Sequence, residues 1–281
     1  MSDAVKRILN LGDPFEQLRQ ATAGINAAQE AVTELARLRR KIIQELRDRG
    51  MSFAEIAEQA GLTRGRIHQI RHQGPHPEGA FLGSGTVIIA TPLKQEAIKA
   101  RPVVAIEDVH ATERLSNLAR SLRLEPRSET IPVGGGEFDL NRPNLVVISG
   151  PRISASIARV LAQDPVLQFE RAADGPWTLV DRRTGEVFRS GQDSDPPRNS
   201  DVAYLGRLPR LDGQGSLIVF TGIHPQGSLG VVDLLCNSIG ELHREVGTSN
   251  FSLLVGTDYD PDSHEPVRVE ILTPPHLMED Q

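Results

Sequence analysis

The segment Gly74-Pro75-His76-Pro77-Glu78-Gly79 constrains the fold most, because it separates two different sequence patterns. Before it, Ile25–Arg49 contains neither proline nor glycine, and its apolar residues recur at helical spacing. After it come short apolar runs rich in β-branched residues, which are typical of buried strands. Two prolines within six residues break a helical pattern. We therefore predict two domains, residues 1–74 and 84–281, joined by a linker at 75–83.

The charge of the chain is divided unequally between these two parts. Through Ala80 there are 12 Lys and Arg residues against 10 Asp and Glu, whereas the rest carries 19 against 27. Such an asymmetry suggests a nucleic-acid-binding module joined to an acidic body. Chance scatter of surface charge is the alternative explanation, because a charge distribution alone rarely identifies a function.

Composition also excludes several classes of protein. No apolar run approaches the roughly 20 residues that a membrane span needs, and the acidic, mixed N-terminus does not resemble a signal peptide. Cys236 is the only cysteine, so neither an intrachain disulfide nor a cysteine metal cluster is possible. We expect a cytoplasmic protein with no membrane partner, no metal and no cofactor.

Residues 1–74 are predicted to be helical almost throughout. Asp13 and Pro14 suit a helix start, with an N-cap residue followed by proline in the first turn. An apolar stripe then runs through Ile25–Arg49, farther than a small DNA-binding core requires. Either this helix packs on its own core, or the stripe is the seam of a homodimer, which suits a two-fold-symmetric DNA-binding protein.

Residues 51–71 predict two short helices joined by a tight turn. Ser52 and Glu55 form a capping-box pattern at the first helix, Gly61 supplies the turn, and Thr63 caps the second helix. No acidic residue occurs between Arg64 and Gln73. A helix with this surface suits a DNA major groove, which presents phosphates and base-edge acceptors.

This segment resembles the region 4 helix-turn-helix of sigma-70-related factors. The matching positions are Ser52, Glu55, Ile56, Ala57, Gly61, Thr63 and Ile67, with Arg37–Arg49 as the preceding basic helix. The resemblance implies double-stranded DNA as a partner. By this resemblance, the residues that contact DNA would be Ser52, Thr63, Arg64, Arg66, His68, Gln69 and Arg71. The aromatic-rich, promoter-melting region of that family is missing, so the resemblance implies a regulator rather than a working sigma factor.

Residues 84–281 predict an α/β domain, because short strands alternate with helical stretches. The strands are expected at 86–90, 103–106, 145–148 and 217–220, and the helices at 111–121, 154–162 and 230–245. Residues 177–181 and 186–188 would form a hairpin, with Trp177 covering it or filling the core. The overall class is therefore α+β with two domains: an all-α helix-turn-helix domain and a Rossmann-like α/β sheet.

Two glycine-bearing loops of this domain are candidate ligand sites, because each follows a strand and precedes a helix. Neither loop has a Walker lysine or a complete dinucleotide pattern, so purely structural turns are the alternative. We expect a small anionic or nucleotide-like ligand. Glu107 and Asp108 would end a neighbouring strand, and Arg207 and Arg210 would be available to anions on an edge strand, 201–207. The candidate ligand-binding residues are Gly150, Arg152, Ser154, Gly222, His224, Gly227 and Ser228.

Three functions fit these patterns. The first is a DNA-binding transcriptional regulator whose C-terminal domain senses a ligand. The second is an enzyme acting on a nucleotide or sugar phosphate, with His224 and either Asp201 or Glu107 as the acid–base pair, although no nucleophile with a suitably spaced base is evident. The third is a scaffold whose C-terminal domain only dimerises or recruits a partner. We assign no catalytic residue.

Overall fold

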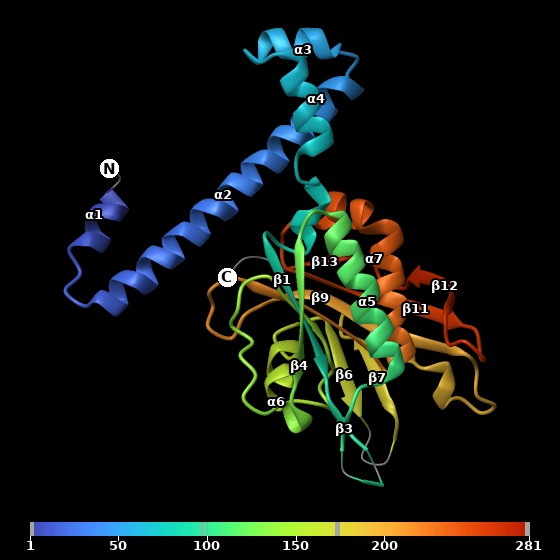
Figure 1. The fold of residues 1–281 in the computed structure, drawn as a ribbon. Helices are drawn as coiled ribbons and strands as arrows, with labels where there is room; N and C mark the ends of the chain where they lie inside the picture. The colour runs from blue at the N-terminus through green and yellow to red at the C-terminus, as the bar shows by residue number, and fades with distance from the viewer. Residues whose placement is uncertain (1–2, 97, 100, 172–174, 279–281) are drawn as a thin grey trace. The chain divides into compact units, whose positions relative to one another are not determined.

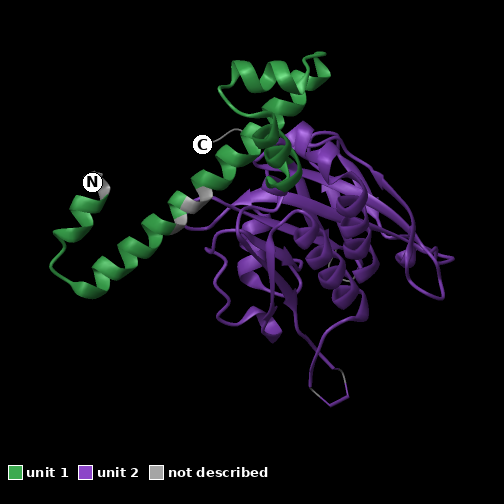
Figure 2. Cartoon of the chain, turned by 45° about the horizontal axis from the view of Figure 1, so that its top comes forward, with its two compact units in different colours: residues 1–77 green, residues 78–281 purple. Residues whose placement is uncertain are grey.

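The computed structural model describes residues 3–96, 98–99, 101–171 and 175–278. The chain forms two compact units, residues 1–77 and residues 78–281 (Figure 2). Among the residues that the structure describes, none of the helices combines the length and the apolar composition of a membrane span.

The first unit is entirely helical. It consists of α1 (Asp3–Leu9), α2 (Pro14–Asp48), α3 (Phe53–Gln59) and α4 (Arg64–Gln73). Asp13 is the N-cap of α2, and its side chain accepts a hydrogen bond from the Phe15 amide at 3.0 Å. Gly24 does not interrupt α2, because one glycine within a long helix costs only about 1 kcal/mol.

The core of the first unit is small and lies where α2, α3 and α4 meet. Its buried members are Ile43, Ile56, Ala57, Ile67 and Ile70. The apolar stripe of α2 extends far beyond this core, since Ile25, Val32 and Leu35 remain exposed. The interpretation that the stripe packs on the helix's own core therefore holds only for the last turns of α2.

The second unit is built on one mixed sheet (Figure 1). The strand order is β12-β11-β9-β10-β5-β1-β4, with β13 also paired to β11. These strands are β1 (Thr86–Pro92), β4 (Glu125–Ile131), β5 (Leu145–Ile148), β9 (Ser200–Pro209), β10 (Ser216–Gly222), β11 (Phe251–Tyr259), β12 (Pro266–Ile271) and β13 (His276–Leu277). The order β4-β1-β5-β10 is parallel, and the remaining pairings are antiparallel.

Two layers cover the faces of this sheet. Helices α5 (Ile106–Ser121) and α7 (Pro225–Val246) share one hydrophobic cluster with one face. On the other face, α6 (Ala155–Leu161) packs together with a three-stranded sheet of β6 (Leu167–Arg171), β7 (Trp177–Asp181) and β8 (Glu186–Arg189). The side chains of β5 alternate between the two clusters, as the strand period of two requires.

Three short elements complete the connections. They are the 3-10 helices η1 (Pro77–Phe81), η2 (Val133–Gly135) and η3 (Gly191–Asp193). Part of the predicted linker is well packed, because Phe81 and Leu82 are buried in the core of the second unit. The predicted hairpin of β7 and β8 is present, with Thr178–Asp181 pairing antiparallel to Glu186–Arg189.

The predicted strand 103–106 is wrong. Only Pro102–Val103 is extended, as β3, and it pairs with β2 (Lys94–Gln95) in a separate two-stranded ladder. Helix α5 begins at Ile106, so Glu107 and Asp108 lie in its first turn rather than at a strand end. Acidic side chains are favourable in the first turn of a helix. The run VVAI resembles a strand and therefore concealed this helix start.

The strand predicted at 201–207 is present within β9, but its predicted position at an edge of the sheet is wrong. Strand β9 lies between β10 and β11, and most of its residues are buried. Arg207 is therefore not available to anions: its guanidinium donates hydrogen bonds to the carbonyl oxygens of Phe81, Gly247 and Ser249. Burial lowers the pKa of Arg207 to about 10. Arg210 forms an ion pair with Asp212 at 3.3 Å.

Candidate nucleic-acid interface and ligand pocket

Helices α3 and α4 have the end caps that their sequence predicts. The Glu55 amide donates to Ser52 Oγ at 3.2 Å, and the Ser52 amide donates to Glu55 Oε2 at 2.7 Å. These bonds lower the pKa of Glu55. Thr63 Oγ1 accepts from the Arg66 amide at 3.1 Å. Gly61 between the helices has φ of 63°, a conformation that glycine adopts at little cost.

One face of α4 is buried and the other is polar and exposed. Ile67 and Ile70 are in the core of the unit. Thr63, Arg64, Arg66, His68 and Gln69 are all exposed, and Arg66 Nη1 donates to Gln69 Oε1 at 3.0 Å. The structure thus places these predicted DNA-binding side chains on one element, with no acid among them. Ser52 stands apart as the half-buried cap of α3.

The C-terminal turn of α4 is more constrained. Arg71 is half-buried, and its guanidinium carbon lies 4.9 Å from the centre of the Phe53 ring, which Arg47 also approaches at 4.5 Å. The rings of His68 and His72 lie 4.2 Å apart. The charge of His68 lowers the pKa of His72, so two adjacent imidazolium groups are disfavoured.

The second unit has a pocket where parallel strands end. Pro92, Ile148 and Gly222 line it from the carboxyl ends of β1, β5 and β10. Its walls include the loop 149–153 and the start of α7. This is the edge at which α/β sheets commonly bind ligands. Five of the predicted ligand-binding residues line the pocket, namely Gly150, Arg152, Gly222, His224 and Ser228.

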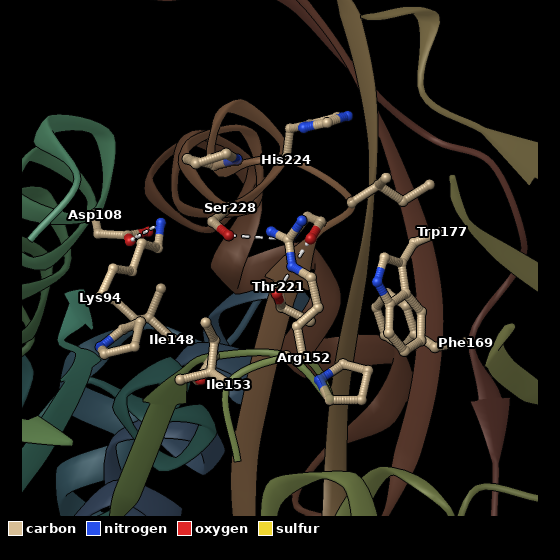
Figure 3. Close-up of a pocket in the computed structure, with 17 residues that line it drawn as sticks. Lys94, Asp108, Ile148, Arg152, Ile153, Phe169, Trp177, Thr221, His224 and Ser228 are labelled. Atoms are coloured by element: carbon tan, nitrogen blue, oxygen red, sulfur yellow. Dashed lines mark hydrogen bonds and ion pairs between the residues drawn. The ribbon is translucent and has the colours of Figure 1, made fainter. Parts of the chain in front are cut away.

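Arg152 extends into this pocket between Ser228 and Trp177 (Figure 3). Among the described residues it forms no hydrogen bond or ion pair. Lys94 lies on another wall and is paired with Asp108 at 3.1 Å. Burial raises the pKa of Asp108, although Lys94 acts in the opposite direction. Ser149 also lines the pocket; it is buried, and its Oγ has no hydrogen-bond partner among the described residues.

The N-terminus of α7 already holds a carboxylate of the chain itself. Asp201 Oδ2 accepts hydrogen bonds from the amides of His224 and Gly227, both at 2.9 Å. Burial raises the pKa of Asp201 to about 6. An anion in the pocket would therefore depend on Arg152 and the 149–153 loop more than on these two amides.

Two predicted residues lie outside the pocket lining because they have local structural roles. Ser154 caps α6, with its Oγ accepting from the Ser156 amide at 3.2 Å, and it packs against Gly135. Gly227 packs against Gly222 and Asp201, and a Cβ at this position would lie 2.6 Å from the Asp201 carboxylate.

The histidines pair with different acids than the sequence predicted. His224 Nε2 lies 3.0 Å from Asp193, which belongs to the short helix η3. The backbone of His224, not its ring, contacts Asp201. Glu107 instead contacts His264 at 2.9 Å. Among the described residues, no group of three His, Cys, Asp or Glu side chains is arranged to hold a metal ion.

Sequence analysis also missed several pocket residues. Phe169 and Trp177 form an edge-to-face pair, with ring centres 6.4 Å apart, at one side of the pocket. Trp177 is half-buried rather than a core residue. Lys94 was missed because no element was predicted at β2, the short strand of the ladder from which it comes. Asp108 was expected at this edge from a strand end, and it lines the pocket instead from the first turn of α5. Only the register of the folded sheet brings these distant segments together.

Comparison with known proteins identifies one part of the chain. The family model for Sigma-70, region 4 matches residues 31–75. Searches of the curated proteins and of the solved structures gave no match. The matched residues contain the end of α2, all of α3 and all of α4. The helix-turn-helix of residues 31–75 therefore matches the Sigma-70 region 4 family, whereas residues 76–281 lie outside this match.

Proposed function

We propose that this protein is a DNA-binding transcriptional regulator. The observation that carries the proposal is the exposed, acid-free face of α4, on a segment that matches Sigma-70 region 4. A helix-turn-helix places its second helix in the major groove, with the N-terminal residues of that helix against base edges. Arg64 and Arg66 occupy this position in α4.

The other predicted contacts divide by position. Gln69 and His68 lie one turn further along α4 and would contact base edges or the sugar-phosphate backbone. Ser52 and Thr63 lie at helix starts, where hydroxyl and amide groups suit phosphate oxygens. Arg71 would contact phosphate while its guanidinium remains stacked on Phe53.

Selection from a fragmented genomic DNA library tests this proposal. The full chain should enrich a limited set of fragments that share a sequence motif. Binding to those fragments should weaken steeply with salt, because phosphate contacts release counterions. Equal recovery of all fragments, or none, would refute the proposal.

We further infer that the second unit senses a small anionic, nucleotide-like ligand in the pocket around Arg152. The exposed guanidinium of Arg152 offers charge, the unpartnered hydroxyl of Ser149 offers a hydrogen bond, and Trp177 offers an aromatic surface. Nucleotides combine an anionic phosphate with a base that stacks on aromatic rings. The Rossmann-like description rests on the same feature, a site at the carboxyl ends of parallel strands.

A thermal-shift screen with nucleotides, sugar phosphates and inorganic phosphate tests the sensor. A ligand of the pocket should raise the melting temperature of the full chain but not that of Arg152→Gln. Arg159→Gln on α6 is the matched control, because Arg159 is exposed and does not line the pocket. Equal shifts in both variants would place the ligand elsewhere.

The same incubations separate a sensor from an enzyme. The His224–Asp193 pair at the pocket is a suitable proton acceptor for an enzyme. Ser228 Oγ, however, already accepts a hydrogen bond from the Gly222 amide at 3.0 Å. Recovery of the bound compound unchanged is the result that a sensor predicts, and its conversion would favour the enzyme.

A further inference from the structure

Helix α2 carries an exposed apolar face that repeats every seven residues. Leu18, Ile25 and Val32 are spaced by seven, and their exposed fractions are 65%, 58% and 66%. Ala21, Ala28 and Leu35 follow each of them by three residues, and Leu35 is 65% exposed. We call these six residues the α2 seam. A spacing of three and four within a seven-residue repeat is the pattern of helices that supercoil around one another.

The positions that flank the α2 seam carry no charge. They are Gln17, Thr22, Gly24, Gln29, Ala31 and Ala36. All charged residues between Pro14 and Leu38 fall at the three remaining positions of the repeat: Glu16, Arg19, Glu30, Glu34 and Arg37. Arg19 pairs with Glu16 at 2.7 Å and Arg37 with Glu34 at 2.6 Å. The helix thus has a broad uncharged face and a separate charged face.

The first unit itself leaves the α2 seam open. Helix α1 approaches α2 at one flank, where Gln17 donates hydrogen bonds to the carbonyl oxygens of Leu9 and Leu11. Helices α3 and α4 pack near the other end, around Ile43. An apolar groove continues from the seam toward them and is lined by Leu35, Leu38, Ile42, Ile56, Ala60 and Leu62, among others.

We propose that the α2 seam is the dimer interface of this protein, and that its occupant is the α2 helix of a second copy. The seven-residue repeat favours this occupant, because it matches a second helix with the same repeat. Two copies also meet without like-charge repulsion, since the flanks are uncharged. The seam is long enough for a dimer contact, as Leu18 to Leu35 spans about 26 Å at 1.5 Å per residue.

The dimer has a consequence for DNA recognition, which rests on the proposed function. Two chains related by a two-fold axis present two copies of α4, and such proteins bind inverted half-sites. The dimer itself does not depend on DNA. It can therefore be tested separately, and its failure would leave DNA binding by one copy untouched.

The test is the molar mass of the full chain in solution, measured by light scattering without DNA. The seam variant is Ile25→Glu with Val32→Glu. The control variant is Ala23→Glu with Ala27→Glu, which adds the same two acids to exposed positions on the other side of the same helix. Circular dichroism checks that all three proteins keep their helices.

We expect the wild type and the control to be dimers at micromolar concentration. The seam variant should be a folded monomer, with dimerisation weakened by roughly 100-fold or more, because each copy would bury two unpaired carboxylates. A monomeric wild type would overturn the proposal, including the case in which the second unit of the same chain covers the seam. A seam variant that remains dimeric would also overturn it.

Discussion

At the scale of single residues, Arg64 and Arg66 carry the proposed recognition of DNA. Arg64→Ala or Arg66→Ala should each weaken binding to a selected fragment by about 1–3 kcal/mol if the side chain reads a base. If the side chain contacts only phosphate, its replacement should instead reduce the number of ions released on binding by about one. Fluorescence anisotropy over a salt series distinguishes the two. Arg19→Ala, on exposed α2, is the control and should bind normally; unchanged affinity in both α4 variants would exclude the assignment.

Asp201 predicts a pH dependence of stability in the second unit. Burial raises the pKa of this carboxyl to about 6 in the folded protein. The folded protein therefore keeps its proton up to about pH 6, whereas the unfolded chain loses it near pH 4. The free energy of unfolding contributed by this group therefore falls as pH rises from about 4 to about 6. Asp201→Asn should remove up to about 3 kcal/mol of this decline.

Urea unfolding of the full chain at several pH values measures this effect. Trp177 is the only tryptophan, so its fluorescence reports the second unit. The difference in stability between Asp201→Asn and wild type should grow from about pH 4 to about pH 6 and then level off. A constant difference between pH 4 and 7 would mean that Asp201 does not titrate in this range.

At the scale of elements, the capping box of α3 holds the helix-turn-helix together. Ser52→Ala removes the acceptor for the Glu55 amide and should destabilise the first unit by about 1 kcal/mol. Amide hydrogen exchange in peptides covering residues 50–70 should accelerate about fivefold. Ser52→Thr keeps the acceptor and should exchange at the wild-type rate. Equal exchange in Ser52→Ala and wild type would show that the cap does not limit opening.

The elements that the sequence predicted well are those with local signals. The ends of α3 and α4 are determined by local interactions, between residues only a few positions apart in the chain. The residues concerned are Ser52, Glu55, Gly61 and Thr63. The strand β9 could not be placed in this way, because its position between β10 and β11 depends on pairing with strands that follow it in the chain. Residues 103–106 were wrongly predicted as a strand because a local signal was followed: their β-branched residues favour a strand, yet α5 begins within this run.

At the scale of the whole molecule, the pocket marks the limit of prediction from sequence. Two glycine loops were predicted to lie at the same edge of the sheet, and the structure brings Gly150 and Gly222 into one lining. Lys94, Phe169 and Trp177 join them only because β2, β6 and β7 fold back over that edge. No spacing rule connects residues so far apart in the chain.

The most direct test of the central claim is genome-wide occupancy of the full chain in cells, compared with the double variant Arg64→Ala with Arg66→Ala. The account predicts discrete sites that share a motif for the wild type, and loss of those sites in the double variant at equal protein level. Equal occupancy by both proteins, or no enriched site for the wild type, would contradict DNA recognition by α4.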